Sequence, residues 1–136
     1  TTSLEKSDND VKAQQVLLEA YKNHDLNSPS YVLFSPNLSD VNEENVAYLG
    51  EVLQILKNNP SINIEITGRA DIQGSEDYNL DLSKERAEAV KTWFIESGIQ
   101  QNRISTKFKG KADPVASNNT IEGKALNRSA QIILKL

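Results

Sequence analysis

Cysteine and methionine are absent from this 136-residue sequence, and histidine occurs once, at His24. Without cysteine the chain can form no disulfide framework, thiolate nucleophile, zinc–thiolate site or cysteine-linked lipid anchor. A single histidine makes a histidine-based catalytic triad, or a metal site with several histidines, nearly impossible to assemble. We therefore expect a protein that is not an enzyme of these classes and that needs no metal and no cofactor.

Long apolar runs are also missing. The longest contain only a few residues, as in Tyr31-Val32-Leu33-Phe34, whereas a membrane span needs about 20. Fifteen Lys+Arg against 19 Asp+Glu give a net charge of −4, which argues against broad electrostatic binding of nucleic acid. We expect neither a transmembrane segment nor a nucleic-acid partner in this fragment.

The residues that are present have the composition of a single globular domain, with 25% charged and 38% hydrophobic residues. The chain begins at Thr1 without a basic-then-apolar leader, so we expect a processed protein or an excised domain. We divide it into residues 1–28, a polar linker followed by a helix, and residues 29–136, the folded domain.

Apolar periodicity within residues 29–136 predicts the order βαβαββ. This order gives an α/β fold of the α+β sandwich type, in which a mixed sheet packs against helices on one face, with an extra helix before it. The predicted strands cover residues 31–34, 61–67, 104–109 and 130–136. The predicted helices cover residues 40–57 and 78–97, and residues 110–127 are predicted to form a long loop.

Local signals place the ends of these elements. Asp40 followed by Glu43 has the spacing of a capping box, which predicts the start of the first helix of the domain. Ile62, Ile64 and Ile66 alternate with polar residues, so they should point to the core side of one strand. Gly98 is well placed to end the second helix.

Two residues of opposite charge could converge near the second predicted strand. Gly68 at the strand end allows the backbone to turn or a ligand to come close, and Asp71 follows just past it. Arg86 comes fifteen residues later, in the predicted helix. Together they could bind a zwitterion, the carboxylate taking an ammonium and the guanidinium fork a carboxylate. The spacing alone equally allows an Asp that stabilises a turn and an Arg that lies in solvent.

A set of motifs occurs in order along the chain. They are Gly68-Arg69-Ala70-Asp71, Tyr78-Asn79, Leu82-Ser83-Lys84-Glu85-Arg86-Ala87-Glu88-Ala89-Val90, Gly98-Ile99, Arg103-Ile104, Pro114-Val115-Ala116-Ser117-Asn118 and Glu122-Gly123-Lys124-Ala125-Leu126-Asn127-Arg128. This set resembles the OmpA-like peptidoglycan-associating domain, whose pattern includes G-[HR]-[TA]-D and L-S-x-x-R-A-x-x-V. The resemblance covers about residues 31–134.

The resemblance implies a periplasmic domain that binds peptidoglycan without covalent chemistry and anchors an outer-membrane or envelope protein to the wall. The implied ligand group is meso-diaminopimelate of the peptide stem, with Asp71 taking its ammonium and Arg86 its carboxylate. Arg128 would add a positive charge near the pocket, or else form only a surface ion pair. The remaining implied ligand-binding residues are Asn37, Arg69, Ile72, Gln73, Gly74, Asn79 and Leu82.

Two positions depart from the family pattern. Arg69 stands where histidine is usual, and it could pair with Asp71 or bind another stem carboxylate. Phe34-Ser35-Pro36-Asn37 lacks the usual acidic residue after the first strand. These departures motivate an alternative function, an OmpA-like module with lost or altered wall binding that engages other envelope proteins. A wall-modifying hydrolase is a more distant alternative.

A basic cluster surrounds the third predicted strand. It consists of Arg103, Lys107, Lys109 and Lys111. We expect a solvated face here, for which anionic wall polymers are conceivable partners.

Overall fold

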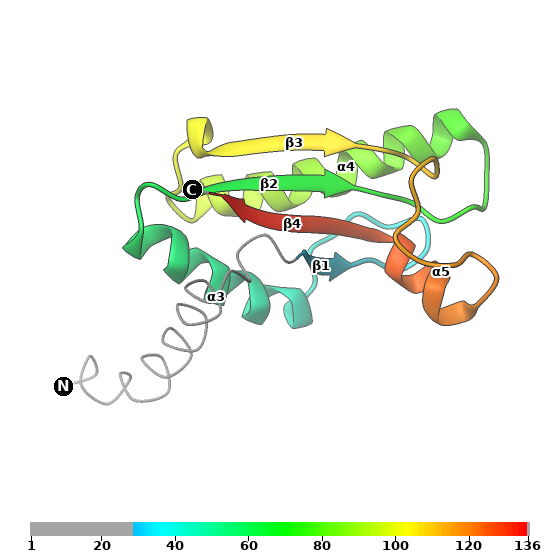
Figure 1. The fold of residues 1–136 in the computed structure, drawn as a ribbon, viewed down its shortest axis with the longest axis horizontal. Coiled ribbons are helices and arrows are strands. Elements are labelled where there is room, and N and C mark those ends of the chain that lie inside the picture. Colours follow the sequence, from blue (N-terminus) through cyan, green and yellow to red (C-terminus); the bar gives the residue numbers. More distant parts are fainter. Residues whose placement is uncertain (1–28, 136) are drawn as a thin grey trace.

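The computed structural model describes residues 29–135, in which four strands form one mixed sheet (Figure 1). The strands are β1 (Ser30–Leu33), β2 (Asn63–Gly68), β3 (Ile104–Phe108) and β4 (Ser129–Lys135). Their order across the sheet is β1-β4-β2-β3. The predicted linker and helix within residues 1–28 lie outside the described residues.

Strand β4 connects the two halves of the sheet. It runs antiparallel to β1 and to β2, with Ile132 opposite Ile66, whereas β2 and β3 are parallel, with Gly68 opposite Phe108. The parallel pair requires a crossover, which helix α4 (Glu76–Glu96) provides. This confirms the predicted mixed sheet.

The first long helix, α3 (Glu43–Asn58), begins later than predicted. The Asn42 side chain accepts a hydrogen bond from the backbone N–H of Asn45 and forms the N-cap. The prediction that Asp40 opens this helix is therefore wrong, because Asn42 is as good a cap and lies three residues before an available N–H. Gly98, with φ +103°, ends α4 as predicted.

The predicted loop over residues 110–127 is wrong in its last third, which forms the short helix α5 (Ile121–Asn127). The oxygen of Thr120 accepts a hydrogen bond from the N–H of Gly123 and caps this helix. Seven residues give too few turns for a readable apolar period, so this helix depends on its cap and on tertiary contacts.

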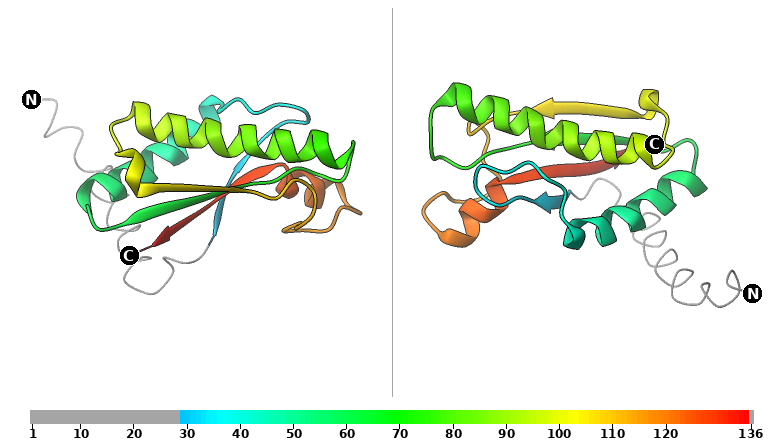
Figure 2. Two further views of the ribbon diagram at one scale, coloured as in Figure 1. Left: turned by 90° about the horizontal axis from the view of Figure 1, so that it is seen from above. Right: turned by 180° about the vertical axis from the view of Figure 1, so that it is seen from behind.

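One hydrophobic core lies between the sheet and the two long helices, which cover the same face (Figure 2). Ile62, Ile64 and Ile66 are buried in it, as their alternation predicts, against residues such as Leu56 and Phe94. On β2 the residue between two of these isoleucines is Glu65, which forms ion pairs with Lys107 and Lys135. At β2 the sheet is therefore apolar toward the helices and carries a cluster of ion pairs on its other face.

Gly68 permits a close approach between β2 and α4. A Cβ atom built at this position would lie 1.8 Å from the carbonyl oxygen of Ser83. The close neighbour of Gly68 is thus the backbone of α4, which brings the side chains of that helix near the end of β2.

Candidate ligand-binding site at the end of strand β2

Asp71 lies where the backbone leaves the end of β2. The two residues before it continue the sheet's hydrogen bonding: the N–H of Arg69 donates to Ser129 O (2.8 Å), and that of Ala70 donates to Gly110 O (2.9 Å). Asp71 itself is only 8% exposed. Its position is therefore fixed by β4 and by the loop after β3, and not only by its own strand.

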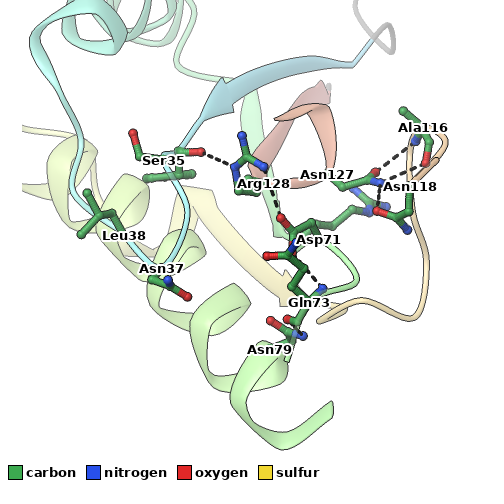
Figure 3. Close-up of polar contacts among 12 residues, drawn as sticks. Ser35, Asn37, Leu38, Asp71, Gln73, Asn79, Ala116, Asn118, Asn127 and Arg128 are labelled. Carbon is green, nitrogen blue, oxygen red and sulfur yellow. Dashed lines mark hydrogen bonds and ion pairs between the residues drawn. The ribbon is translucent and has the colours of Figure 1, made fainter. Parts of the chain in front are cut away.

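The Asp71 carboxylate has two partners (Figure 3). Oδ2 accepts from Nη1 of Arg128 at 3.2 Å, and Oδ1 accepts from the backbone N–H of Gln73 at 3.0 Å. Nε of Arg128 donates to Phe34 O at 3.1 Å. The two charged side chains keep 11% and 18% of their surface, so the pair is mostly covered but still reachable from solvent. Arg128 thus lies beside Asp71 in a mostly covered ion pair, and not in a pair at the exposed surface.

Arg86 is a charged side chain with no exposed surface. Its guanidinium donates to three backbone carbonyl groups, those of Leu38 (2.9 Å), Arg69 (2.9 Å) and Ser35 (3.2 Å). Burial lowers the pKa of Arg86 to about 10, an effect that the Asp71 carboxylate opposes and the Arg128 guanidinium reinforces. At neutral pH Arg86 is therefore charged. The charges of Asp71 and Arg128 both act on its guanidinium.

The edge of Arg86 that suits a carboxylate is already occupied. A guanidinium presents two parallel N–H groups to a carboxylate, and one such pair consists of Nε and Nη2. Here Nε donates a hydrogen bond to Leu38 O and Nη2 donates one to Ser35 O. Both acceptors belong to the connection between β1 and α3. A ligand carboxylate could use this edge only after the connection moves away.

The loop after Asp71 is held from α4. Asn79 is buried, and its Nδ2 donates to Gln73 O at 2.7 Å. Gly74 has φ +93°, a conformation that favours glycine, and its carbonyl accepts from Lys111 Nζ at 3.0 Å. In contrast, Ile72 is 52% exposed. Residues 71–74 thus form a short anchored loop with one apolar side chain at the surface.

Arg69 does not pair with Asp71. Its guanidinium donates to the carboxylate and the backbone carbonyl of Asp113 and to the side chain of Gln131. The suggested pairing of Arg69 with Asp71 is therefore wrong in this structure: Arg128 occupies the carboxylate, and Arg69 fixes the loop after β3 to β4. Both Arg69 partners are distant in sequence, so neither could be found from local spacing.

Asn37 and Leu82 occupy different surroundings. Asn37 is exposed, with φ 62°, and its Oδ1 accepts from the hydroxyl of Tyr78 at 2.8 Å. This bond ties the β1–α3 connection to the first turn of α4. Leu82 is only 6% exposed and offers little surface to a ligand. Sequence reasoning missed Tyr78 as a contact, because its partner lies 41 residues away.

The expected solvated basic face is wrong for Arg103. Its guanidinium donates to three backbone carbonyls around the end of α3, those of Leu56, Asn59 and Ile62. It therefore holds the α3–β2 turn in place. Lys107 is largely exposed and forms a 3.7 Å ion pair with Glu65.

Asn127 is a further residue whose role sequence reasoning missed. It is fully buried, and its amide makes four hydrogen bonds: Oδ1 accepts from Val115 N and Ala116 N, and Nδ2 donates to Ala116 O and Asn118 Oδ1 (Figure 3). Asn127 thereby fixes the loop before α5 and, through the chain, the adjacent Arg128.

The site thus brings one carboxylate together with two guanidinium groups. Such a set can exchange internal ion pairs for those of a ligand that carries both an ammonium and a carboxylate. Among residues 29–135, the structure contains no group of three or more His, Cys, Asp or Glu residues placed to hold a metal ion. In the same part of the chain, no helix combines the length and the apolar character that spanning a bilayer requires.

Several known proteins are similar to this chain in sequence. The chain is 37% identical over 109 residues to the probable lipoprotein YiaD of Escherichia coli, covering 80% of this chain and 50% of that protein. It is 37% identical over 86 residues to the peptidoglycan-binding protein ArfA of Mycobacterium tuberculosis, covering 63% of this chain and 26% of that protein. The chain therefore spans about half the length, or less, of these relatives.

Solved structures show the same fold. The peptidoglycan-associated lipoprotein of Burkholderia pseudomallei superposes with a TM-score of 0.73 at 31% identity, over 77% of this chain and 89% of that one. Residues 33–128, which contain Asp71, Arg86 and Arg128, match the OmpA family. The chain belongs to the OmpA family.

Proposed function

We propose that this domain binds the peptide stem of peptidoglycan non-covalently and thereby anchors its parent envelope protein to the wall in the periplasm. The observation that carries the proposal is the Asp71–Arg128 ion pair, partly covered, beside the buried Arg86. Relatives named as peptidoglycan-binding and peptidoglycan-associated proteins support it. No covalent step is required of any residue in the site.

The ligand group in this proposal is meso-diaminopimelate, whose free end carries an ammonium and a carboxylate on one carbon. The ammonium replaces Arg128 at Asp71, and the released guanidinium of Arg128 becomes available to the ligand carboxylate. Each internal ion pair that is lost is then replaced by one with the ligand, so no charge is left unpaired in a covered site. A ligand with only one of the two groups would leave one protein charge without a partner.

Arg86 joins this exchange if the β1–α3 connection withdraws. Its Nε donates to Leu38 O and its Nη2 donates to Ser35 O, at the positions where the two oxygens of a ligand carboxylate would bind. The proposal therefore includes displacement of residues 35–38 on binding. The hydrogen bond between Tyr78 and Asn37 opposes that displacement and should reduce the affinity.

A modest affinity is sufficient for anchoring. A hydrogen bond to a charged group contributes about 1.5–3 kcal/mol, and the ordering of ligand and loop offsets part of the sum. We expect a dissociation constant between about 1 μM and about 1 mM for a single stem. The wall presents many stems, so a tethered domain meets them at a high effective concentration.

Sedimentation with purified sacculi tests the proposal. The wild-type chain should pellet with insoluble peptidoglycan, whereas Asp71→Asn, which removes the charge but keeps the shape, should stay largely in the supernatant. Asp81→Asn, an exposed carboxylate on α4, is the matched control and should pellet like the wild type. Thermal unfolding of each variant checks that the fold is intact.

The alternative function, an interaction module without wall binding, has one observation in its favour. The carboxylate-binding edge of Arg86 is filled by the protein's own carbonyl groups. If the folded wild-type chain does not pellet, wall binding fails and this alternative takes its place. Release of soluble muropeptides in the same assay would instead indicate a hydrolase.

A further inference from the structure

A groove of about 570 Å³ lies between α4 and the connection from β1 to α3, apart from the site described above. Its apolar surface comes from Val41, Ala89 and Trp93, all partly exposed. Neither Asp71 nor Arg128 lines it. Trp93 also contacts the core through an edge-to-face arrangement with Phe94, so its position is fixed.

Four carboxylates surround this apolar surface: Asp40, Glu85, Glu88 and Glu96. Three of them belong to α4, at spacings of about one and two turns that place them along one side of the helix over about 16 Å. Among the described residues, none of the four forms a salt bridge. The groove thus carries four negative charges, and no cation of residues 29–135 lies within ion-pair distance of any of them.

We propose that this groove docks a basic amphipathic segment of a partner protein, with Lys or Arg side chains along the carboxylates and an apolar side chain against Trp93. The carboxylates around an apolar centre make the groove complementary in charge to such a segment. The three α4 carboxylates are spread along the helix, and in residues 29–135 no three His, Cys, Asp or Glu side chains lie together so as to hold a metal ion, so an extended polycation fits the groove better than a single metal ion.

Other occupants match the groove less well in charge. Residues 1–28 carry five Asp or Glu and three Lys, a net charge of −2, so their overall charge has the same sign as the groove. A second copy of the chain carries −4 overall, although its β3 region is locally basic. A peptide stem ends in carboxylates, which the groove would repel.

Trp93 is the only tryptophan of the chain and lines this groove, so a change in tryptophan fluorescence on binding reports on this part of the molecule. The probe is a helical peptide of about 14 leucine and lysine residues with its leucines on one side, which covers about four turns. Titration into the full chain should give a saturable change in Trp93 emission. The apparent affinity should fall about tenfold when ionic strength rises from about 0.01 M to about 0.15 M, because the Debye length shortens from about 30 Å to about 8 Å. The same peptide with glutamate in place of lysine should give no change.

Matched variants locate the response. Glu88→Gln/Glu96→Gln should weaken the apparent affinity about tenfold. Glu51→Gln/Glu122→Gln removes the same charge from exposed positions that do not line the groove, and it should bind like the wild type. Asp71→Asn should also bind the peptide normally, which separates this proposal from wall binding.

Three results would overturn the proposal. They are an unchanged emission, a response that survives Glu88→Gln/Glu96→Gln, and equal binding of the glutamate peptide. A Trp93 emission that depends on protein concentration, together with a dimer in sedimentation, would show that a second copy occupies the groove. If segment 1–28 occupies it, Lys12→Gln/Lys22→Gln would shift the Trp93 emission of the isolated chain without any peptide, and the partner proposal would fail.

Discussion

Arg86 has a structural role in addition to the ligand-binding role that we propose for it. Its guanidinium joins the end of β2 to the β1–α3 connection through carbonyl groups of Ser35, Leu38 and Arg69. It also lies 5.3 Å from the ring of Phe34. Burial of a charge without a directly bonded carboxylate is costly, and several hydrogen bonds are needed to offset that cost.

Arg86→Lys should therefore lower stability as well as binding. An ammonium cannot replace the planar set of donors, so at least one buried carbonyl loses its partner. We expect the free energy of unfolding to fall by about 2–4 kcal/mol, measured by urea denaturation. Sacculus binding at a temperature where the variant is fully folded should also be weaker. Wild-type stability in this variant would show that the three carbonyl contacts contribute little.

A second prediction at the residue scale concerns how Glu65 makes the stability of the fold depend on pH. The hydrogen bond from Lys135 (2.9 Å) lowers the pKa of the Glu65 carboxyl below its ordinary value of 4.5; desolvation opposes this shift, and the charge of Lys107 adds to it. The folded protein thus holds this proton less tightly than the unfolded chain does. The ion pairs therefore stabilise the fold above about pH 4.5, and this contribution is lost as the pH falls through the lowered pKa.

Glu65→Gln should flatten the acid side of the stability profile. The effect should be below about 1 kcal/mol, because both lysine partners are exposed to solvent. Urea denaturation at a series of pH values from neutral to about pH 3 measures it. Lys135→Gln should flatten the profile in the same direction, whereas Lys135→Arg should keep the wild-type slope. Parallel profiles for the wild type and Glu65→Gln would contradict the assignment.

At the residue scale, some of the residues at the site could be predicted from the sequence, but their contacts could not. Asp71 and Arg86 stand out because they lie in a recognisable series of motifs. Their partners do not: Asp71 pairs with Arg128, 57 residues away, and Arg69 with Gln131, 62 residues away. Two arginines compete for one carboxylate, and only the positions of β4 and the loop after β3 decide which of them binds it.

At the scale of secondary-structure elements, the position of α4 depends on how closely it approaches β2. The missing side chain of Gly68 leaves room for the carbonyl of Ser83, and this contact sets the height of α4 above the strand. The arrangement also determines where Arg86, one turn further along α4, meets the end of β2. A change at Gly68 should thus affect both stability and the site.

Gly68→Ala should destabilise the fold by about 2–4 kcal/mol, because the added methyl group meets backbone atoms that cannot rotate away. Gly50→Ala is the matched control: no atom lies within 4 Å of the added carbon, and the position is inside α3. That variant should gain about 0.5–1 kcal/mol from helix propensity. Urea denaturation measures both changes, and equal stabilities for the two variants would show that the β2–α4 contact is not tight.

Element types could be read from periodicity, but short elements and exact starts could not. The alternation of Ile62, Ile64 and Ile66 predicted β2, and Gly98 predicted the end of α4, because each signal is local. Helix α5 has only seven residues; Thr120 caps its first turn through the N–H of Gly123, and Asn127 bonds it to the preceding loop. Its stability comes from tertiary contacts, which periodicity does not report.

The whole molecule brings four segments to one end of the sheet. These are the β1–α3 connection, the loop after β2, the first half of α4 and the junction of α5 with β4. The last three of these segments continue an element of the core or are hydrogen-bonded to one, whereas the β1–α3 connection must move before Arg86 can bind a ligand carboxylate. Order in those three segments would let ligand groups meet charges held close to their final positions, which reduces the entropy lost on binding.

The proposed wall binding is tested most directly by amide chemical shifts of the labelled full chain during titration with free meso-diaminopimelate. We predict saturable shifts at residues 71–74, at Asn79 and at Leu38, and their loss in Asp71→Asn. Pentane-1,5-diamine, which keeps both ammonium groups but lacks the carboxylates, should produce far smaller shifts. Shifts that are absent, that are equal for the diamine, or that persist in Asp71→Asn would contradict recognition of an ammonium–carboxylate group at this site.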